Sequence, residues 1–144
     1  MDVRLAAFAD ALDGFSYLVS LDLQELGKTL DERVIDGLQN GKVQKFEYTI
    51  ELCWKAIKQA LRALEGIDEA SPKKVIKAWY LAGYLDETDY FRLLAAIDDR
   101  NQLSHVYDEA AFNAIIARLP DHARLLKGVL TSISEAVGQS DGAR

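Results

Sequence analysis

The chain has 144 residues, of which 49% are hydrophobic and 28% charged, and its formal net charge is −6. A chain of this length can fold as one domain that buries about 68 to 70% of its unfolded surface, and this composition is typical of a globular protein. The acidic balance argues against broad electrostatic adhesion to nucleic acid, because that binding needs basic side chains that displace counterions from phosphates, so any contact with RNA must be local.

The first half of the chain contains two long apolar stripes. Apolar residues recur every three or four positions, which predicts one helix over about 2–27 and a second over about 43–64. Gly66 is placed to end the second helix. Between the two, the sequence predicts a connector that holds a short helix around 31–38, followed by a turn at Asn40-Gly41.

The second half predicts three further helical segments, each preceded by a residue that favours an N-cap. The segments span about 72–81, 87–103 and 109–137, and the capping residues are Ser71, Asp86 and Asp108. Pro120 interrupts the last segment, because a helical proline lacks an N–H and clashes with the carbonyl four residues earlier. We therefore expect two helices that meet near Leu119. The polar residues from Gly138 onward predict a flexible tail.

The pattern as a whole favours an all-α protein. The sequence has no strand-like alternation of useful length, no internal repeat and no linker. It predicts a helical bundle of four main helices plus short accessory helices, as a single domain over 1–137 with a C-terminal tail at 138–144.

The sequence also bears on where the protein works. Residues 1–11 interleave charged and apolar side chains, unlike a signal peptide, and no run approaches the roughly 20 apolar residues of a membrane span. The single cysteine, Cys53, lies among apolar helical residues, which predicts a buried thiol. We expect a cytoplasmic protein that does not associate with a membrane.

On the predicted helix at 87–103, polar residues replace apolar ones on the core-facing side near the C-terminal end. At about 100° per residue, Tyr90, Leu93 and Ile97 share an apolar face. The same count places three polar residues on this face next: Asn101, Ser104 and His105. Burying them unpaired would cost about 1 to 3 kcal/mol each, so they must be satisfied internally, border a cleft or face a partner.

Arg100 and His105 lie five residues apart, so their side chains would diverge on an unbroken helix. If the helix ends near Leu103 and the next begins after Asp108, the intervening elbow can turn His105 toward Arg100. Alternatively, a second subunit can supply the missing group. Either arrangement makes a composite site.

These residue types suit cleavage of RNA without a metal ion. A histidine can take the proton of a 2′-hydroxyl or give one to the leaving oxygen. The guanidinium of Arg100 can hold a phosphate through two hydrogen bonds, and Asn101 can orient the imidazole or donate to the phosphate. On the spacing alone an interhelical hydrogen-bonding cluster is the favoured interpretation, and RNA cleavage stays open as the alternative.

Other polar residues point to ordinary surface roles. Glu47, Glu51 and Lys55 follow one another at four-residue steps, which is more typical of a solvated face with one helical ion pair than of a metal site. The chain has two histidines and no H-E-x-x-H sequence, so we expect no metal and no cofactor. His122 follows Pro120 closely and is expected to be solvated.

The segment R-N-Q-L-S-H-V-Y at 100–107 has the form R-x4-H-x-Y. It resembles the motif of HEPN-domain proteins that are encoded beside a minimal nucleotidyltransferase (MNT). The resemblance extends over about 8–137 and includes successive segments of the nucleotidyltransferase substrate-binding protein family. These segments are KFEYTIELCWKAIKQAL at 45–61, SPKKVIKAWYLAGYLD at 71–86 and IARLPDHARLL at 116–126.

The resemblance implies an antiparallel up-and-down bundle that forms a homodimer, with both R-x4-H motifs at the interface. It implies a toxin that cleaves RNA without metal, in which Arg100 and His105 are catalytic and Asn101 and Ser104 support them. Tyr107 matches the tyrosine that the partner MNT antitoxin modifies with AMP, and that group would obstruct an RNA phosphate. The alternative is a non-catalytic substrate-binding or regulatory subunit of a separate nucleotidyltransferase, in which Arg100 and His105 serve binding or dimer cohesion.

Overall fold

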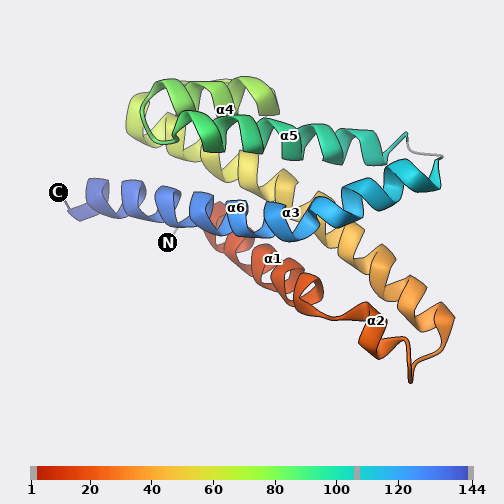
Figure 1. The fold of residues 1–144 in the computed structure, drawn as a ribbon. Coiled ribbons are helices and arrows are strands. Elements are labelled where there is room, and N and C mark those ends of the chain that lie inside the picture. Colours follow the sequence, from red (N-terminus) through yellow and green to blue (C-terminus); the bar gives the residue numbers. More distant parts are fainter. Residues whose placement is uncertain (1–2, 106–107, 143–144) are drawn as a thin grey trace.

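The computed structural model describes residues 3–105 and 108–142, and this part of the chain forms six α-helices (Figure 1). Their bounds are α1 Val3–Ser20, α2 Leu23–Leu26, α3 Glu32–Glu65, α4 Pro72–Leu81, α5 Glu87–Leu103 and α6 Glu109–Gly142. Four helices are long and two are short, and the described residues contain no strand. The all-α bundle of four main helices with accessory helices is therefore confirmed.

Helix α3 is the central element of the bundle. It packs against α1, α4, α5 and α6, and α6 in turn contacts α1 and α5. Figure 1 shows α4 and α5 side by side near the C-terminal half of α3, with α2 at the opposite end of the molecule. Over the described residues, no helix combines the length and the apolarity needed to cross a bilayer.

The core forms where the apolar faces of α1, α3, α4, α5 and α6 meet. Its largest fully buried side chains are Phe8, Phe15, Phe46, Ile50, Ile57, Leu61, Ile76, Trp79, Leu93, Ile115, Leu119 and Leu126. Burial of apolar surface is the main favourable term in folding, and helical periodicity collects that surface on one side of each helix. Cys53 is 1% exposed, which confirms the predicted buried thiol, and burial raises its pKa.

The predicted caps of α5 and α6 are confirmed. Asp86 accepts a hydrogen bond from the backbone N–H of Asp89 at 2.7 Å, and Asp108 accepts one from that of Ala110 at 3.0 Å. Each bond satisfies a backbone donor that the first turn of a helix leaves free. As a result, the bounds of α5 agree with the predicted range. Pro72 opens α4 as predicted, although the side chain of Ser71 makes no capping bond.

Two predicted boundaries in the first half of the chain are wrong. The first helix ends at Ser20 rather than near residue 27, because the side chain of Asp22 accepts a hydrogen bond from the N–H of Glu25 and starts α2. Helix α3 passes through Asn40-Gly41 without a turn. At Gly41 the helix lies against Leu18 of α1, so packing between two long helices outweighs the local turn preference.

The predicted break at Pro120 is also wrong, because α6 continues through it as one helix. A proline removes one hydrogen bond from the helix, but Leu119 and Ala123 are buried on either side of it. Their packing holds both halves of α6 against the core. The helix also extends to Gly142, past Gly138, where the sequence predicts the start of a flexible tail.

Gly66 ends α3 in the left-handed conformation, with φ of 65°. A side chain at that φ is strained, so Gly66→Ala should lower the free energy of unfolding by about 1 kcal/mol. Gly37→Ala is the matched control, because Gly37 lies inside the same helix with open space around its Cβ position, and it should raise stability by about 0.5 to 1 kcal/mol. Urea unfolding measures both changes, and equal changes for the two variants would contradict this account of Gly66.

Candidate functional site

The site predicted from the sequence lies where α5 ends and the chain turns into α6. Ser104 follows the last helical residue, and the N–H of His105 donates to the carbonyl of Gln102 at 2.9 Å. Helix α6 begins at Glu109. We call residues 104–108 the elbow. Its Val106 and Tyr107 lie outside the described residues, so the proposed modification site at Tyr107 is a prediction without a structural description.

The polar side chains of this region are on the surface of the single chain. Asn101, Ser104 and His105 are all exposed. Arg100 is half-buried, and its Nη2 lies 3.4 Å from Oε2 of Glu51 on α3. No hydrogen bond or ion pair between the described residues joins Arg100 to His105. Within one chain, therefore, Arg100 is held against Glu51 and His105 faces solvent.

Glu51 links Arg100 to two further residues of α3. The indole N–H of Trp54 donates to Oε2 of Glu51 at 3.1 Å, and Nζ of Lys55 lies 3.6 Å from Oε1. The predicted ion pair within this helix is thus confirmed, whereas the contact across to Arg100 was not predicted. The Nε of Arg100 is buried without a hydrogen-bond partner, so the guanidinium retains a free donor.

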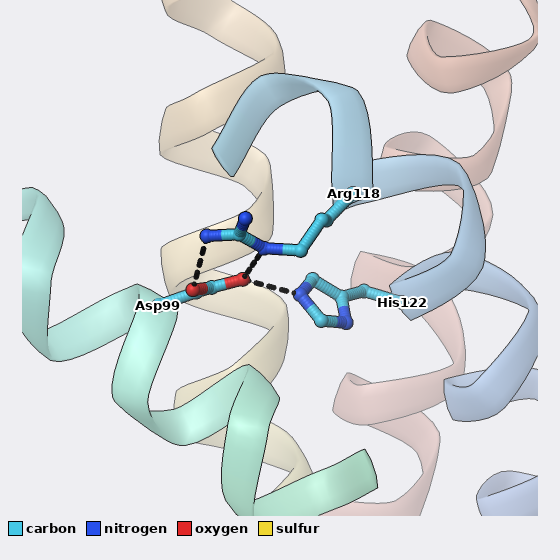
Figure 2. Close-up of polar contacts among 3 residues, drawn as sticks. All are labelled: Asp99, Arg118 and His122. Carbon is cyan, nitrogen blue, oxygen red and sulfur yellow. Dashed lines mark hydrogen bonds and ion pairs between the residues drawn. The ribbon is translucent and has the colours of Figure 1, made fainter. Parts of the chain in front are cut away.

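A second polar cluster, which the sequence did not predict, lies between α5 and α6 (Figure 2). Arg118 of α6 donates twice to Asp99 of α5, from Nε to Oδ2 at 2.9 Å and from Nη2 to Oδ1 at 2.8 Å. Nε2 of His122, also on α6, lies 2.7 Å from Oδ2 of the same carboxylate. We call Asp99, Arg118 and His122 the α5–α6 clamp.

The electrostatics of the clamp favour an ionised carboxylate. Asp99 is 6% exposed, and this burial alone would raise its pKa. The hydrogen bonds from Arg118 and His122 outweigh burial and hold the pKa of Asp99 below its ordinary value. The same carboxylate raises the pKa of Arg118. Both groups are therefore charged at neutral pH, and together they form a two-bond ion pair.

The prediction of a solvated His122 is wrong. The residue is 7% exposed, and its ring stacks on Phe46 of α3 with centroids 5.3 Å apart and planes 15° apart. The error follows from the predicted break at Pro120, which detached His122 from the apolar face of α6. On a continuous helix His122 joins the buried stripe of Ile115, Leu119 and Leu126, and that spacing was the available signal.

A surface pocket of about 560 Å³ lies between α5 and α6 beside the clamp. Its wall includes Arg92, Arg118 and Arg124, and each of these arginines pairs with an aspartate: Asp89, Asp99 and Asp121, respectively. The pocket consequently has little excess positive charge to attract an anion. Over the described residues, no three His, Cys, Asp or Glu side chains come together as a metal site would require.

The geometry defines an all-α bundle protein with an R-x4-H segment at the exposed end of one helix and the buried, paired carboxylate of Asp99 directly before it. Residues 4–135 match the family model described as "Nucleotidyltransferase substrate binding protein like". The chain belongs to this family. No curated protein matches it.

Solved structures support this assignment. A protein from Thermus thermophilus is 35% identical, with a TM-score of 0.74 over 88% of this chain and 98% of its own. A Haemophilus influenzae protein, described as having the fold of a substrate binding domain of a nucleotidyltransferase, is 23% identical, with a TM-score of 0.75 over 90% and 98%. A tri-AMPylated Shewanella oneidensis HEPN toxin in complex with an MNT antitoxin is 12% identical, with a TM-score of 0.74 over 94% and 99%. The last two likenesses establish a shared fold.

Asp99→Asn tests the charge of the clamp. At pH 7 the variant should be about 2 to 3 kcal/mol less stable, because it loses buried hydrogen bonds to an ionised group. The pKa of Asp99 is lower in the folded state, so its stabilisation is complete above the unfolded pKa of about 3.9 and is lost as pH falls through the folded pKa. The difference from wild type should hold from pH 7 to 5 and shrink below pH 4.

Urea unfolding at each pH measures this difference. Asp98→Asn is the matched control, because Asp98 is the preceding residue and forms an exposed ion pair with Lys73 at 2.6 Å. That loss should cost less than about 1 kcal/mol. A stability difference for Asp99→Asn that persists unchanged to pH 3 would contradict the account of the clamp.

Proposed function

We propose that this chain is the HEPN toxin of a toxin-antitoxin module, which cleaves RNA through Arg100 and His105 and is silenced by an MNT partner. The observation that carries the proposal is the exposure of the R-x4-H segment: His105, Asn101 and Ser104 are open to solvent and thus available to an RNA backbone or to a second copy. Family membership and the fold shared with a HEPN toxin in complex with an MNT antitoxin support it.

The proposed chemistry needs only protein side chains. One imidazole takes the proton of a ribose 2′-hydroxyl as that oxygen bonds to the adjacent phosphorus. The bond from phosphorus to the 5′-oxygen then breaks, and the leaving oxygen receives a proton from a second acid. In a homodimer, His105 and the equivalent histidine of the other copy supply these two roles. Positioned general acid or base catalysis is worth roughly 10² to 10⁴ in rate.

Arg100 binds the phosphate in this scheme. Its guanidinium can stabilise the charge that grows on the phosphate oxygens, and Asn101 can donate to the same group. In the unbound chain Glu51 holds Arg100 at 3.4 Å, so RNA must share or displace that carboxylate. The Nε of Arg100 is buried and unpaired, so a guanidinium that moves away from Glu51 toward solvent would offer a phosphate this donor as well.

The proposed control of the toxin lies two residues beyond His105. The partner nucleotidyltransferase would transfer AMP from ATP to the hydroxyl of Tyr107 with release of pyrophosphate, which would add bulk and negative charge near the imidazole. Both effects oppose the approach of an RNA phosphate.

A second candidate function is a non-catalytic subunit that presents a substrate to a separate nucleotidyltransferase. One observation favours it: Arg100 pairs with Glu51, and among the described residues no hydrogen bond or ion pair joins it to His105. Under this interpretation, Arg100 and His105 serve binding or dimer cohesion. RNA cleavage by the purified chain distinguishes the two candidates.

We expect purified protein to cleave single-stranded RNA in the presence of a metal chelator, and His105→Ala to lower the rate by about 10² to 10⁴, because the variant lacks the general acid or base. Gln102→Ala is the matched control, since Gln102 is an exposed residue near the same helix end without a proposed role. It should cleave like wild type. Equal rates for wild type and His105→Ala would reject the nuclease. An inactive wild type that binds the nucleotidyltransferase would favour the second candidate.

Co-expression with the neighbouring nucleotidyltransferase should add AMP units to the chain, as measured by intact mass. Tyr107→Phe should abolish the addition, because it removes the accepting hydroxyl. Tyr48→Phe is the control, because Tyr48 is 55% exposed on α3 and should leave the modification intact. A modified Tyr107→Phe chain would show that the target is another residue.

A further inference from the structure

We propose that Asp99, Arg118 and His122 are positioning residues, which together fix the end of α5 so that Arg100 and His105 keep their places. The consequence for catalysis rests on the proposed function, whereas the positioning itself does not. Asp99 directly precedes Arg100 in α5, and Arg118 and His122 lie one turn apart on α6 and converge on it (Figure 2).

The clamp is directional. Both oxygens of Asp99 are used, since Oδ1 accepts from Nη2 of Arg118 while Oδ2 faces Nε of Arg118 and Nε2 of His122. A planar guanidinium that bonds both oxygens sets the rotation of the two helices as well as their separation. The hydrophobic effect that drives core burial is non-directional, whereas these hydrogen bonds have a fixed direction. The clamp therefore adds a directional constraint to the packing of the core.

The last turn of α5 is held from two sides. Adjacent helical residues point about 100° apart, so Asp99 and Arg100 face different neighbours. Asp99 is held by α6, and Arg100 pairs with Glu51 of α3. The ring of His122 also stacks on Phe46 of α3, so the clamp is itself fixed to the central helix. The position of Arg100 is thus defined by three helices.

The clamp also joins the end of α5 to the first half of α6. The chain leaves α5 at Leu103 and enters α6 at Glu109, while Asp99 and Arg118 join the two helices on either side of this crossing. Releasing the clamp would let the end of α5 shift along α6 without breaking the apolar contacts deeper in the bundle. His105 would move with it, and a displacement of about 1 Å can cost roughly 10²-fold in catalysis.

Arg118→Gln is the variant that tests the clamp, because the Arg118 side chain is 47% exposed and its removal leaves the core intact. Arg124→Gln is the matched control: Arg124 is an arginine of the same helix, 70% exposed, and pairs only with Asp121 on α6. The chain has two histidines, so the ring signals of His105 and His122 in ¹H–¹³C NMR spectra are readily assigned with His105→Gln. The His105 ring reports on the elbow without reference to any activity.

In Arg118→Gln we expect the His105 ring signal to shift or broaden and RNA cleavage to fall about 10- to 100-fold, with helical content preserved. Arg124→Gln should match wild type in both measurements. An unchanged His105 signal in Arg118→Gln would overturn the positioning role, whatever happens to cleavage. If wild-type protein does not cleave RNA, the proposed function fails, and the His105 signal still decides the role of the clamp.

Should Arg118→Gln not fold, His122→Phe takes its place with the same readouts. The phenyl ring preserves the stack on Phe46 and removes only the bond to Asp99. His105 is then the remaining histidine, so its signal is read without overlap. A shift of that signal in His122→Phe supports the clamp, and an unmoved signal overturns it.

Discussion

The buried carboxylate of Asp99 constrains how α5 and α6 can meet. At 6% exposure its charge requires hydrogen-bonding partners, because an unpaired ionised group inside a protein is very costly. Both partners come from α6: the guanidinium of Arg118 and the ring of His122. The first half of α6 must therefore lie along the end of α5, which is where the pairing of charge places it.

The end of α5 and the two residues that follow it place side chains in two different environments. Asp99 points into the bundle, whereas Asn101, Ser104 and His105 remain in solvent. The polar residues that interrupt the apolar face are thus not a defect of packing, since the helix reaches the edge of the core at this point. A side chain needed for chemistry must be accessible, and one needed for rigidity must be enclosed. Because Asp99 and His105 lie close together in the chain, the exposed histidine is attached to a helix end that the buried carboxylate holds in place.

Helical periodicity predicted the architecture because the core depends on a repeat that is visible in any short window. The errors at Asn40-Gly41 and Pro120 arose where a local signal for a break was outweighed by packing along a long helix. The clamp could not be predicted in this way, since Arg118 and His122 lie 19 and 23 residues from Asp99. A contact across helices leaves no local pattern. The break in the apolar face singled out Asn101, Ser104 and His105, whereas the proposed role of Tyr107 came only from the resemblance to a family.

The single chain contains the parts of the proposed site without assembling them. Arg100 is balanced by Glu51, and the carboxylate of Glu51 is also shared with Trp54 and Lys55. An acceptor shared among three donors holds each less firmly than a dedicated pair such as Asp99 and Arg118. A phosphate could therefore bind Arg100 in place of Glu51 at modest cost, while His105 needs a partner group that the described part of its own chain does not bring to it. A second copy that turns its elbow toward the first would supply that group, which is why the homodimer is part of the proposed mechanism.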